Sequence, residues 1–418
     1  MFRRDFLQLS SSLALAAPAL AQDQPMTVRD FLGKLAYTRE DVSIFLDPAQ
    51  RNWAKFDPVM GYLLQDGVLH DGVDGARTVL SFGTAGERKT INFASRPCRI
   101  NTYGDSFTQG HQVSDGETWQ EYLAAHFGEP VRNFGIGGYG VYQAYRRMLR
   151  EEATPSAAEY LVLNIWGLDD HLRSIDSWRW LRFGESWRTR PEHRHMFHGN
   201  PWAHVRLDPR SGRLVELQNP YPTPGSLYKL CDNDYVYETF RDDLIVKLLL
   251  AQRKGAGVNL KELEALAAWL NVRADLSSPD AVAETARAVH VEYALRAGMH
   301  VVEKARAFAL EKKKKLLVLL SYDSGTVRRA CEGLPRPDDS FVGFLRDKKI
   351  LFVDVLAKHV EDFKTFRLSP QEYISRYFIG HYKPVGNHFF AFAIKDAVAA
   401  WLDPKPVAYR TGSETIRP

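Results

Sequence analysis

The stretch NTYGDSFTQG, residues 101–110, decides how the rest of the chain is interpreted. Its first residues continue an apolar run over 99–103 that is typical of a buried strand, and Ser106 follows that run directly. Gly104 permits a sharp turn of the backbone between the two. A serine in this position lies at the edge of a sheet, where its N–H can face the negative charge that develops on a substrate carbonyl oxygen. Taken alone, Gly-Asp-Ser would fit a surface turn equally well.

Four further apolar runs have the composition of buried parallel strands. They lie at 131–134, 160–165, 316–320 and 350–355, and most are separated by segments long enough for helices, such as 118–126 and 141–152. This alternation predicts an α/β fold with a central parallel sheet of about five strands and helices on both faces. Right-handed crossovers then bring the loops that follow the strands to one edge of the sheet.

The segments around these strands differ in character. Residues 22–96 contain several Asp-Gly turns and predict an N-terminal β-hairpin extension. The roughly 150 residues between the third and fourth runs are too many for one crossover helix, so we expect a large insertion after the third strand. We expect the main domain to consist of two halves, 97–170 and 278–403. An insertion rich in Trp and Arg, 171–277, separates the halves, and a C-terminal tail, 404–418, follows them.

Two local signals stand out between the third and fourth strands. Residues 205–215 predict a hairpin that is closed by a Ser-Gly turn. Ser278-Pro279 is a good helix start, because a side-chain cap is followed by proline in the first turn. We expect that helix to continue to about Lys312.

The first 21 residues have the pattern of an export signal. Arg3-Arg4 precedes a mildly apolar run that is rich in Ala, Ser and Leu and ends in Ala19-Leu20-Ala21, a cleavage pattern of small residues. We interpret 1–21 as a twin-arginine signal and expect a bacterial protein that is periplasmic or secreted. No later stretch reaches the roughly 18 consecutive apolar residues of a membrane-spanning helix, so we expect no membrane span in the mature protein.

Composition narrows the class of protein further. The 418 residues are 45% hydrophobic and 25% charged, which is ordinary for a globular protein and excludes long disorder and coiled-coil rods. The 55 Lys and Arg residues against 51 Asp and Glu residues give a net charge of +4, too small to indicate nucleic-acid binding through bulk charge. We therefore expect no nucleic-acid partner, and the sequence leaves the oligomeric state open.

Residues that commonly bind metals show no strong pattern. The three cysteines have no CxxC spacing, so they indicate no metal knuckle and no disulfide scaffold; they are Cys98, Cys231 and Cys331. A second group matches no strong zinc spacing; it consists of Glu192, His193, His195 and His198. We expect no metal and no cofactor.

Two later segments supply partners for Ser106. The loop NFGIGGYG, residues 133–140, follows the second strand, and its glycines allow close approach of the backbone, with the Gly138 N–H as a candidate oxyanion donor. It is no dinucleotide-binding loop, because it follows the second strand rather than the first. The segment HYKPVGN, residues 381–387, opens the final helix, and His381 there can reach over the sheet edge and take the proton of Ser106 as a general base. His388, seven residues further on, is expected to pack or to lie on the surface rather than to act as a second base.

Together these blocks resemble the SGNH (GDSL-type) hydrolase family over about 97–170 and 369–401. By this resemblance Ser106 is the nucleophile, Gly138 an oxyanion donor and His381 the base, with Gly386 at the family's spacing behind it. The resemblance implies a flavodoxin-like three-layer α/β/α sandwich. It also implies ester hydrolysis through an acyl-enzyme, most often the removal of acetyl groups from carbohydrates or the cleavage of lipid esters.

The chain departs from the family's pattern in its third block. The family has Gly-x-Asn-Asp there, with an Asn that donates to the oxyanion, whereas this chain has Gly167-Leu168-Asp169-Asp170. An ionised Asp169 would repel an oxyanion. Either Asp169 is therefore held protonated, or another donor such as Asn164 replaces it.

The second departure concerns the acid of the catalytic triad. The family places an Asp two or three residues before the histidine, where this chain has Phe378 and Ile379. Four acids at predicted strand ends are candidates to orient His381 instead; they are Asp169, Asp170, Asp323 and Asp354, with the first two slightly favoured. A backbone carbonyl in this role would make a Ser–His dyad.

The insertion is a candidate lid, because it follows the third strand and can fold over the edge where Ser106 lies. Tryptophans stack on sugar rings and arginines hold carboxylates or sulfates. The residues expected to bind substrate are Trp178, Trp180, Trp187, Arg182 and Arg188. An acetylated, acidic polysaccharide or its oligomers is therefore the expected substrate, unless the tryptophans form the insertion's own core. Two other functions remain open: O-acetyl transfer to a polysaccharide with the same Ser and His, and carbohydrate binding without turnover.

Overall fold

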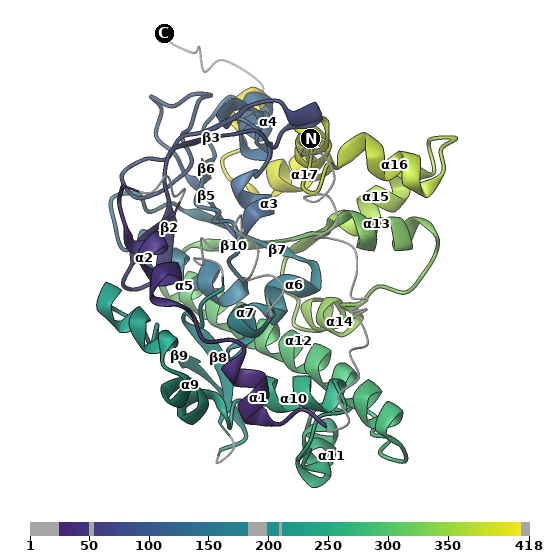
Figure 1. Ribbon diagram of the computed structural model, residues 1–418. Helices are drawn as coiled ribbons and strands as arrows, with labels where there is room; N and C mark the ends of the chain where they lie inside the picture. The colour runs from purple at the N-terminus through teal and green to yellow at the C-terminus, as the bar shows by residue number, and fades with distance from the viewer. Residues whose placement is uncertain (1–24, 50–53, 183–198, 209–210, 411–418) are drawn as a thin grey trace.

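A computed structural model of the protein describes residues 25–49, 54–182, 199–208 and 211–410 (Figure 1). Several sequence predictions fall outside these ranges, namely the export signal at 1–21, Trp187, Arg188, and the group Glu192, His193, His195 and His198. Among the described residues, no helix combines the length and the apolar character that a membrane crossing requires.

The centre of the molecule is a five-stranded sheet. Its strands are β5 (Ile100–Tyr103), β6 (Arg132–Asn133), β7 (Tyr160–Trp166), β10 (Lys315–Ser321) and β11 (Phe352–Asp354). They lie in the order β11-β10-β7-β5-β6, and every neighbouring pair is parallel. The prediction of an α/β fold with a parallel sheet of about five strands is confirmed. The long apolar runs predicted β7 and β10 correctly because these two strands are buried along most of their length.

Strand order places the loops that matter for chemistry side by side. The chain runs from β5 to the edge strand β6 and then returns to β7 on the other side of β5. All carboxyl ends therefore point to one edge, with the loops after β5, β6 and β7 adjacent there.

The helices around the sheet form two packed groups. One contains α5 (Val141–Glu151), α6 (Gly167–Leu172) and α12 (Pro279–Glu311), and the other contains α4 (Trp119–Phe127), α15 (Val355–Phe363) and α17 (Pro384–Trp401). Figure 1 shows the first group below the strands and the second above them. Both α12 and α15 contact β10 directly. The apolar faces of these helices and the buried strands form one hydrophobic core.

The long segment between β7 and β10 contains the two local features that the sequence predicts. Strands β8 (His204–Asp208) and β9 (Arg213–Leu217) pair as an antiparallel hairpin. Helix α12 begins after Ser278, whose side chain accepts a hydrogen bond from the Ala281 N–H, and continues for 33 residues. Both predictions are confirmed. The segment also contains α7 (Trp178–Leu181), the 3-10 helix η4 (Pro224–Cys231), α9 (Asn233–Phe240), α10 (Leu244–Gln252) and α11 (Leu260–Trp269).

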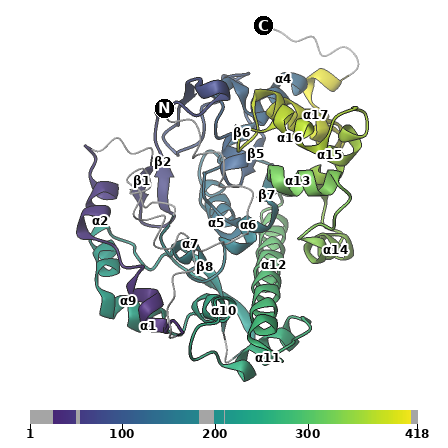
Figure 2. The ribbon, with the colours of Figure 1, turned by 45° about the vertical axis from the view of Figure 1, so that its right-hand side comes forward.

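The N-terminal part contains the expected hairpins and two helices that the sequence analysis missed. The hairpins are β1 (Ala54–Asp57) with β2 (Gly61–Leu64) and β3 (Gly67–Leu69) with β4 (Thr78–Leu80). Helices α1 (Val28–Gly33) and α2 (Arg39–Leu46) each begin with a capping box in which a threonine and an aspartate satisfy each other's backbone N–H groups. Helix α1 packs against α9 and α10, as Figure 2 shows, so this part contacts the β7–β10 segment.

The remaining elements complete the C-terminal half and the short turns. They are α3 (Ser106–Gln109), α13 (Ser324–Cys331), α14 (Asp339–Asp347), α16 (Pro370–Tyr377) and the 3-10 helices η1 (Val73–Gly75), η2 (Asp115–Glu117) and η5 (Val407–Tyr409). The three cysteines form no disulfide bond.

The turn after β5 is held from two sides. The Arg88 guanidinium, 1% exposed, donates hydrogen bonds to the carbonyls of Gln109, Gly110 and Val113 and to the Asp115 carboxylate. On the other side, a Cβ at Gly104 would lie 2.0 Å from the Thr108 hydroxyl oxygen. The loop around Ser106 is therefore fixed by a buried cation and by a close approach that only glycine permits.

We predict that Gly104→Ala lowers the free energy of unfolding by about 2 kcal/mol or more, because the methyl group forces apart atoms of the nucleophile turn and β7. The measurement is urea denaturation followed by circular dichroism. Gly116→Ala is the matched control, because a Cβ there meets no atom within 4 Å. Equal stability of the two variants would contradict the assigned tight packing.

Candidate active site

Ser106 and His381 meet at the carboxyl edge of the sheet. Ser106 is the first residue of α3, directly after β5, and His381 lies in the short connection between α16 and α17. The His381 Nε2 is 2.7 Å from the Ser106 Oγ, although 275 positions separate the two residues. Ser106 is 7% exposed. The pairing expected from the sequence is present, and a serine hydroxyl in contact with an imidazole nitrogen can be activated as a nucleophile.

The connection that carries His381 is fixed by its own hydrogen bonds. The Ile379 N–H donates to the His381 carbonyl (2.9 Å), and the Lys383 N–H donates to the Tyr377 carbonyl (2.8 Å). The Tyr382 hydroxyl lies 2.7 Å from the Nε2 of His359, a fully buried residue. These contacts hold the imidazole over the sheet edge without help from a substrate.

The group that faces the other nitrogen of His381 is the side-chain amide of Gln112. Its Oε1 accepts a hydrogen bond from the His381 backbone N–H (2.8 Å) and lies 3.2 Å from Nδ1. Its Nε2 donates to the Asp71 carbonyl (3.0 Å), which fixes the orientation of the amide. An amide oxygen can only accept, so it selects the tautomer with the proton on Nδ1 and leaves Nε2 free to take the serine proton.

None of the four acids proposed from the sequence contacts His381, so that prediction is wrong. Asp323 caps α13, and Asp354 binds Arg336 at 2.6 Å. Asp169 and Asp170 face Arg173 instead. Gln112 was missed because an amide carries no charge and stands outside the family blocks; its one signal was its place six residues after Ser106.

The environment of His381 keeps the imidazole neutral. Burial lowers the pKa of His381 well below its usual value, and the nearby His111 and Arg173 lower it further. The His111 ring lies edge-on to the His381 ring, with 4.8 Å between centroids. The Nε2 of His111 lies 3.3 Å from the Asp71 carboxylate, so this acid is a partner of His111 rather than of His381. A neutral His381 can accept a proton at neutral pH.

Two backbone N–H groups beside Ser106 are available to a ligand. In the described part of the chain, neither the Ser106 N–H nor the Gly138 N–H donates a hydrogen bond. The loop after β6 lies against the serine, since a Cβ on Gly137 would be 3.6 Å from that of Ser106. Its carbonyls are fixed from behind, that of Gly137 by the Tyr62 hydroxyl (2.7 Å) and that of Gly138 by Arg179. These two N–H groups can donate to the negative oxygen of a substrate carbonyl whose carbon has bonded to the Ser106 Oγ.

Both sequence-based suggestions for a third donor are wrong. The Asn164 amide is buried and donates to the Thr108 hydroxyl (3.0 Å), on the inner side of α3. Asp169 is not held protonated: burial opposes its ionisation, but Arg173 and Arg182 outweigh burial and lower its pKa. Arg182 lies 3.2 Å from the Asp169 carboxylate.

Two of the predicted substrate-binding tryptophans, Trp178 and Trp180, pack against other parts of the chain. Trp180 is fully buried against Phe240, with 4.7 Å between ring centroids. Trp178 packs edge-on against His290 of α12 at the same distance. Trp180 is therefore part of the core and cannot stack on sugar, whereas Trp178 is half-buried, so its predicted contact with sugar stays a prediction. Arg182 does reach the site through Asp169, whereas His388 packs against Tyr122, as expected.

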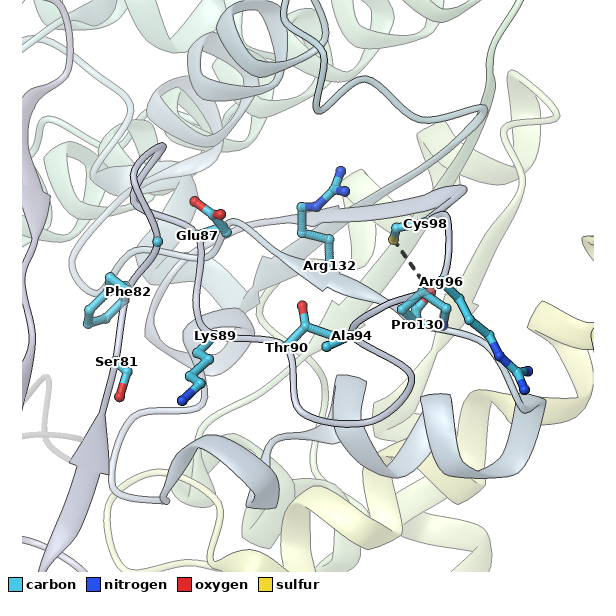
Figure 3. Close-up of a pocket in the computed structure, with 11 residues that line it drawn as sticks. Ser81, Phe82, Glu87, Lys89, Thr90, Ala94, Arg96, Cys98, Pro130 and Arg132 are labelled. Carbon is cyan, nitrogen blue, oxygen red and sulfur yellow. Dashed lines mark hydrogen bonds between the residues drawn. The ribbon is translucent and has the colours of Figure 1, made fainter. Parts of the chain in front are cut away.

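A cavity of the described residues lies away from the Ser–His pair. Its volume is about 410 Å³, and Figure 3 shows Lys89, Arg96 and Arg132 around it. Its lining includes neither Ser106 nor His381. Burial raises the pKa of the Cys98 thiol, which makes it a poor nucleophile. Among the described residues there is also no group of three or more His, Cys, Asp or Glu side chains that could hold a metal ion.

Comparison with known proteins adds no assignment, since no family model matches the chain and no curated protein is similar to it. The chemistry must therefore be inferred from the site itself. A neutral imidazole oriented by Gln112, a serine hydroxyl 2.7 Å away and two open backbone donors form an arrangement that can transfer an acyl group through the serine.

We predict that Gln112→Glu raises the pKa of His381, because a carboxylate beside Nδ1 favours the charged imidazolium. The measurement is an NMR titration of the His381 ring protons. Gln65→Glu is the control, since Gln65 is a partly buried glutamine whose amide donates to the Ala54 carbonyl and is not a partner of His381 in any described contact. A titration of His381 that is unchanged in Gln112→Glu would contradict the contact with Gln112.

Proposed function

We propose that this protein is a serine esterase of the SGNH type, which removes acetyl or other short acyl groups from a carbohydrate or polysaccharide through an acyl-enzyme. The observation that carries the proposal is the 2.7 Å contact between the Ser106 Oγ and the His381 Nε2 at the carboxyl edge of a parallel sheet. The order of the resembling blocks along the chain agrees with it, because the loops after β5 and β6 and the residue before α17 converge.

The strand order supports the fold that the resemblance implies. Numbered along the chain, the sheet runs 2-1-3-4-5, which is the order of flavodoxin-like proteins. The two helix groups fit the outer layers of a three-layer sandwich. In such sheets, ligands bind outside the carboxyl ends where the strand order reverses, which here is between β5 and β7. Ser106 follows β5 and Asp169 follows β7, so the candidate site occupies that position.

The proposed reaction uses the side chains in the order that their contacts suggest. The Ser106 Oγ attacks the ester carbonyl carbon while its proton passes to the His381 Nε2. The carbonyl oxygen becomes an oxyanion that the Ser106 and Gly138 N–H groups face. His381 then gives the proton to the leaving sugar oxygen, and the acyl group stays on Ser106. Water, activated by the same imidazole, releases the acid and restores the hydroxyl.

The amide of Gln112 makes the absence of a triad carboxylate tolerable. A triad acid holds the imidazole in the correct orientation and tautomer. Here the Gln112 amide oxygen supplies the acceptor for the Nδ1–H of His381. It does not supply the negative charge that stabilises an imidazolium, so we expect slow turnover. This arrangement favours an enzyme over a carbohydrate-binding protein without turnover, because binding alone needs no hydrogen-bonded Ser–His pair.

Two further features support the proposed substrate class and location. Arg182, beside Asp169, is 24% exposed in its side chain and can contact an acidic sugar at the rim of the site. The twin-arginine pattern of 1–21 supports export to the periplasm or beyond, where acetylated polysaccharides occur outside the cytoplasm.

We predict that the protein releases acetate from acetylated pectin, alginate or xylan oligomers and that Ser106→Ala lowers the rate at least about a thousandfold. The measurement is enzymatic quantification of acetate. Ser340→Ala, on exposed α14, is the control and is expected to keep the wild-type rate. Absence of acetate release from every polymer, with p-nitrophenyl acetate also untouched, would overturn the proposal; acetate transferred to an added sugar would instead assign acyl transfer.

We predict that kcat/KM stays level as the pH falls below 6.5 and declines only at lower pH. The base works when neutral, and burial lowers the pKa of His381 well below the usual 6.5, so the neutral form persists into acid. Burial also raises the pKa of Asp105 to about 6, and its protonation removes negative charge beside Ser106 without consuming the base. The check is a pH–rate profile with an acetyl ester; an acid limb centred at or above pH 6.5 would contradict the assigned environment of His381.

A further inference from the structure

Three carboxylates surround the place where an oxyanion would form. Asp105 precedes Ser106 and has no exposed surface, and its Oδ2 lies 3.2 Å from the Ser106 hydroxyl. Asp169 and Asp170 lie in the first turn of α6 after β7, and Asp169 is at the position where the family supplies an Asn donor. Asp169 is ionised, so its negative charge opposes the stabilisation that two backbone N–H groups give to a negative substrate oxygen. A nearby positive group is needed to offset that charge.

The Arg173 guanidinium contacts all three carboxylates. Arg173 is the C-cap of α6, and its side chain folds back along the helix to form a close ion pair with Asp169. Its Nη1 lies 3.7 Å from Asp170 and 3.9 Å from Asp105. The same nitrogen is 3.4 Å from the Tyr139 carbonyl, one residue after the candidate donor Gly138. Arg173 therefore lies among all three segments that would form an oxyanion site.

The guanidinium retains donors that the protein uses incompletely. Arg173 is 92% buried, being 8% exposed, and its Nε has no hydrogen-bond partner in the described part of the chain. Nη1 makes contacts of 3.4 Å and longer, whereas charge-assisted hydrogen bonds are about 2.7–2.9 Å. A buried cation with unfilled donors is costly unless a ligand completes them.

The neighbours of Arg173 fix its direction. Its guanidinium lies 5.2 Å from the centre of the Trp166 ring, and Trp166 stacks in turn on Phe107 beside the nucleophile. The positive charge of Arg173 also lowers the pKa of His381. The guanidinium cannot move away without losing its contacts with Asp169 and the Trp166 ring.

We propose that Arg173 is a catalytic residue that supplies the third oxyanion contact in place of the family's Asn, with Asp169 as the residue that positions it. This inference rests on the proposed esterase function. As the bond between the Ser106 Oγ and the carbonyl carbon forms, the π electrons move to the carbonyl oxygen, and the Ser106 proton moves to the His381 Nε2. The Arg173 guanidinium then donates to that oxygen with the N–H groups of Ser106 and Gly138. When the carbonyl re-forms, the leaving oxygen departs with the proton from His381.

The proposal explains why an acid in the third block is compatible with catalysis. Asp169 alone would repel the oxyanion, but paired with a guanidinium it holds a fork of donors in place. Arg182 also binds Asp169, so the carboxylate keeps one partner when Arg173 is replaced. Removal of Arg173 therefore does not leave Asp169 unpaired.

The test compares Arg173→Met and Arg173→Lys with wild type. We expect kcat for an acetyl ester to fall about 10²–10³-fold in Arg173→Met, with KM changed much less, since the contact is made in the transition state. Affinity for an alkyl boronic acid, which forms an anionic tetrahedral adduct on serine, should fall by a similar factor. Arg173→Lys keeps the charge but not the fork, and we expect a smaller loss of both.

The control separates catalysis from folding. Arg206→Met removes another arginine that binds a buried carboxylate, that of Asp176 at 2.9 Å, and should lower thermal stability while kcat stays at the wild-type value. Folded Arg173→Met or Arg173→Lys protein with wild-type kcat and wild-type boronate affinity would overturn the role of Arg173. If wild type itself hydrolyses no ester and binds no boronate at Ser106, the proposed esterase function has failed instead.

Discussion

The hydrogen bond between the Ser106 Oγ and the His381 Nε2 is the contact on which the interpretation of this molecule depends. It joins the end of strand β5 to the connection before the last long helix, and it exists because the parallel sheet brings its carboxyl ends to one edge. Each participant is held from behind: the serine turn by Arg88 and Gly104, the histidine by Gln112. Preorganisation of this kind lowers the cost of reaching the transition state.

Electrostatics at the site differ from those of a carboxylate-based triad. The partner of the imidazole is a neutral amide, burial keeps His381 uncharged, and three acidic side chains instead gather around Arg173. A charged group is therefore absent beside His381, where a triad acid would lie. Charged groups are instead concentrated at the position where the family has a neutral Asn. In the mechanism that we propose, this arrangement gives a base that stays neutral in acid and a cation beside the oxyanion.

The sequence predicted the scaffold better than the site. Apolar runs located all five sheet strands, since buried strands need continuous apolar residues, and Ser278-Pro279 located the start of α12. Ser106 and His381 were found because their order along the chain matches the resembling family. Gln112 and Arg173 were missed because their roles depend on distances across the fold, and a tryptophan such as Trp180 carries no mark that tells a core position from a sugar platform.

We propose that Ser106 accepts an acyl group from an ester while His381 moves the proton. The most direct measurement is mass spectrometry of peptides from protein that has been mixed with p-nitrophenyl acetate and quenched in acid during turnover. The account predicts one acetyl group, located on Ser106, and none there in His381→Ala. Turnover of the ester with Ser106 unmodified, or with the acetyl group on another residue, would contradict it.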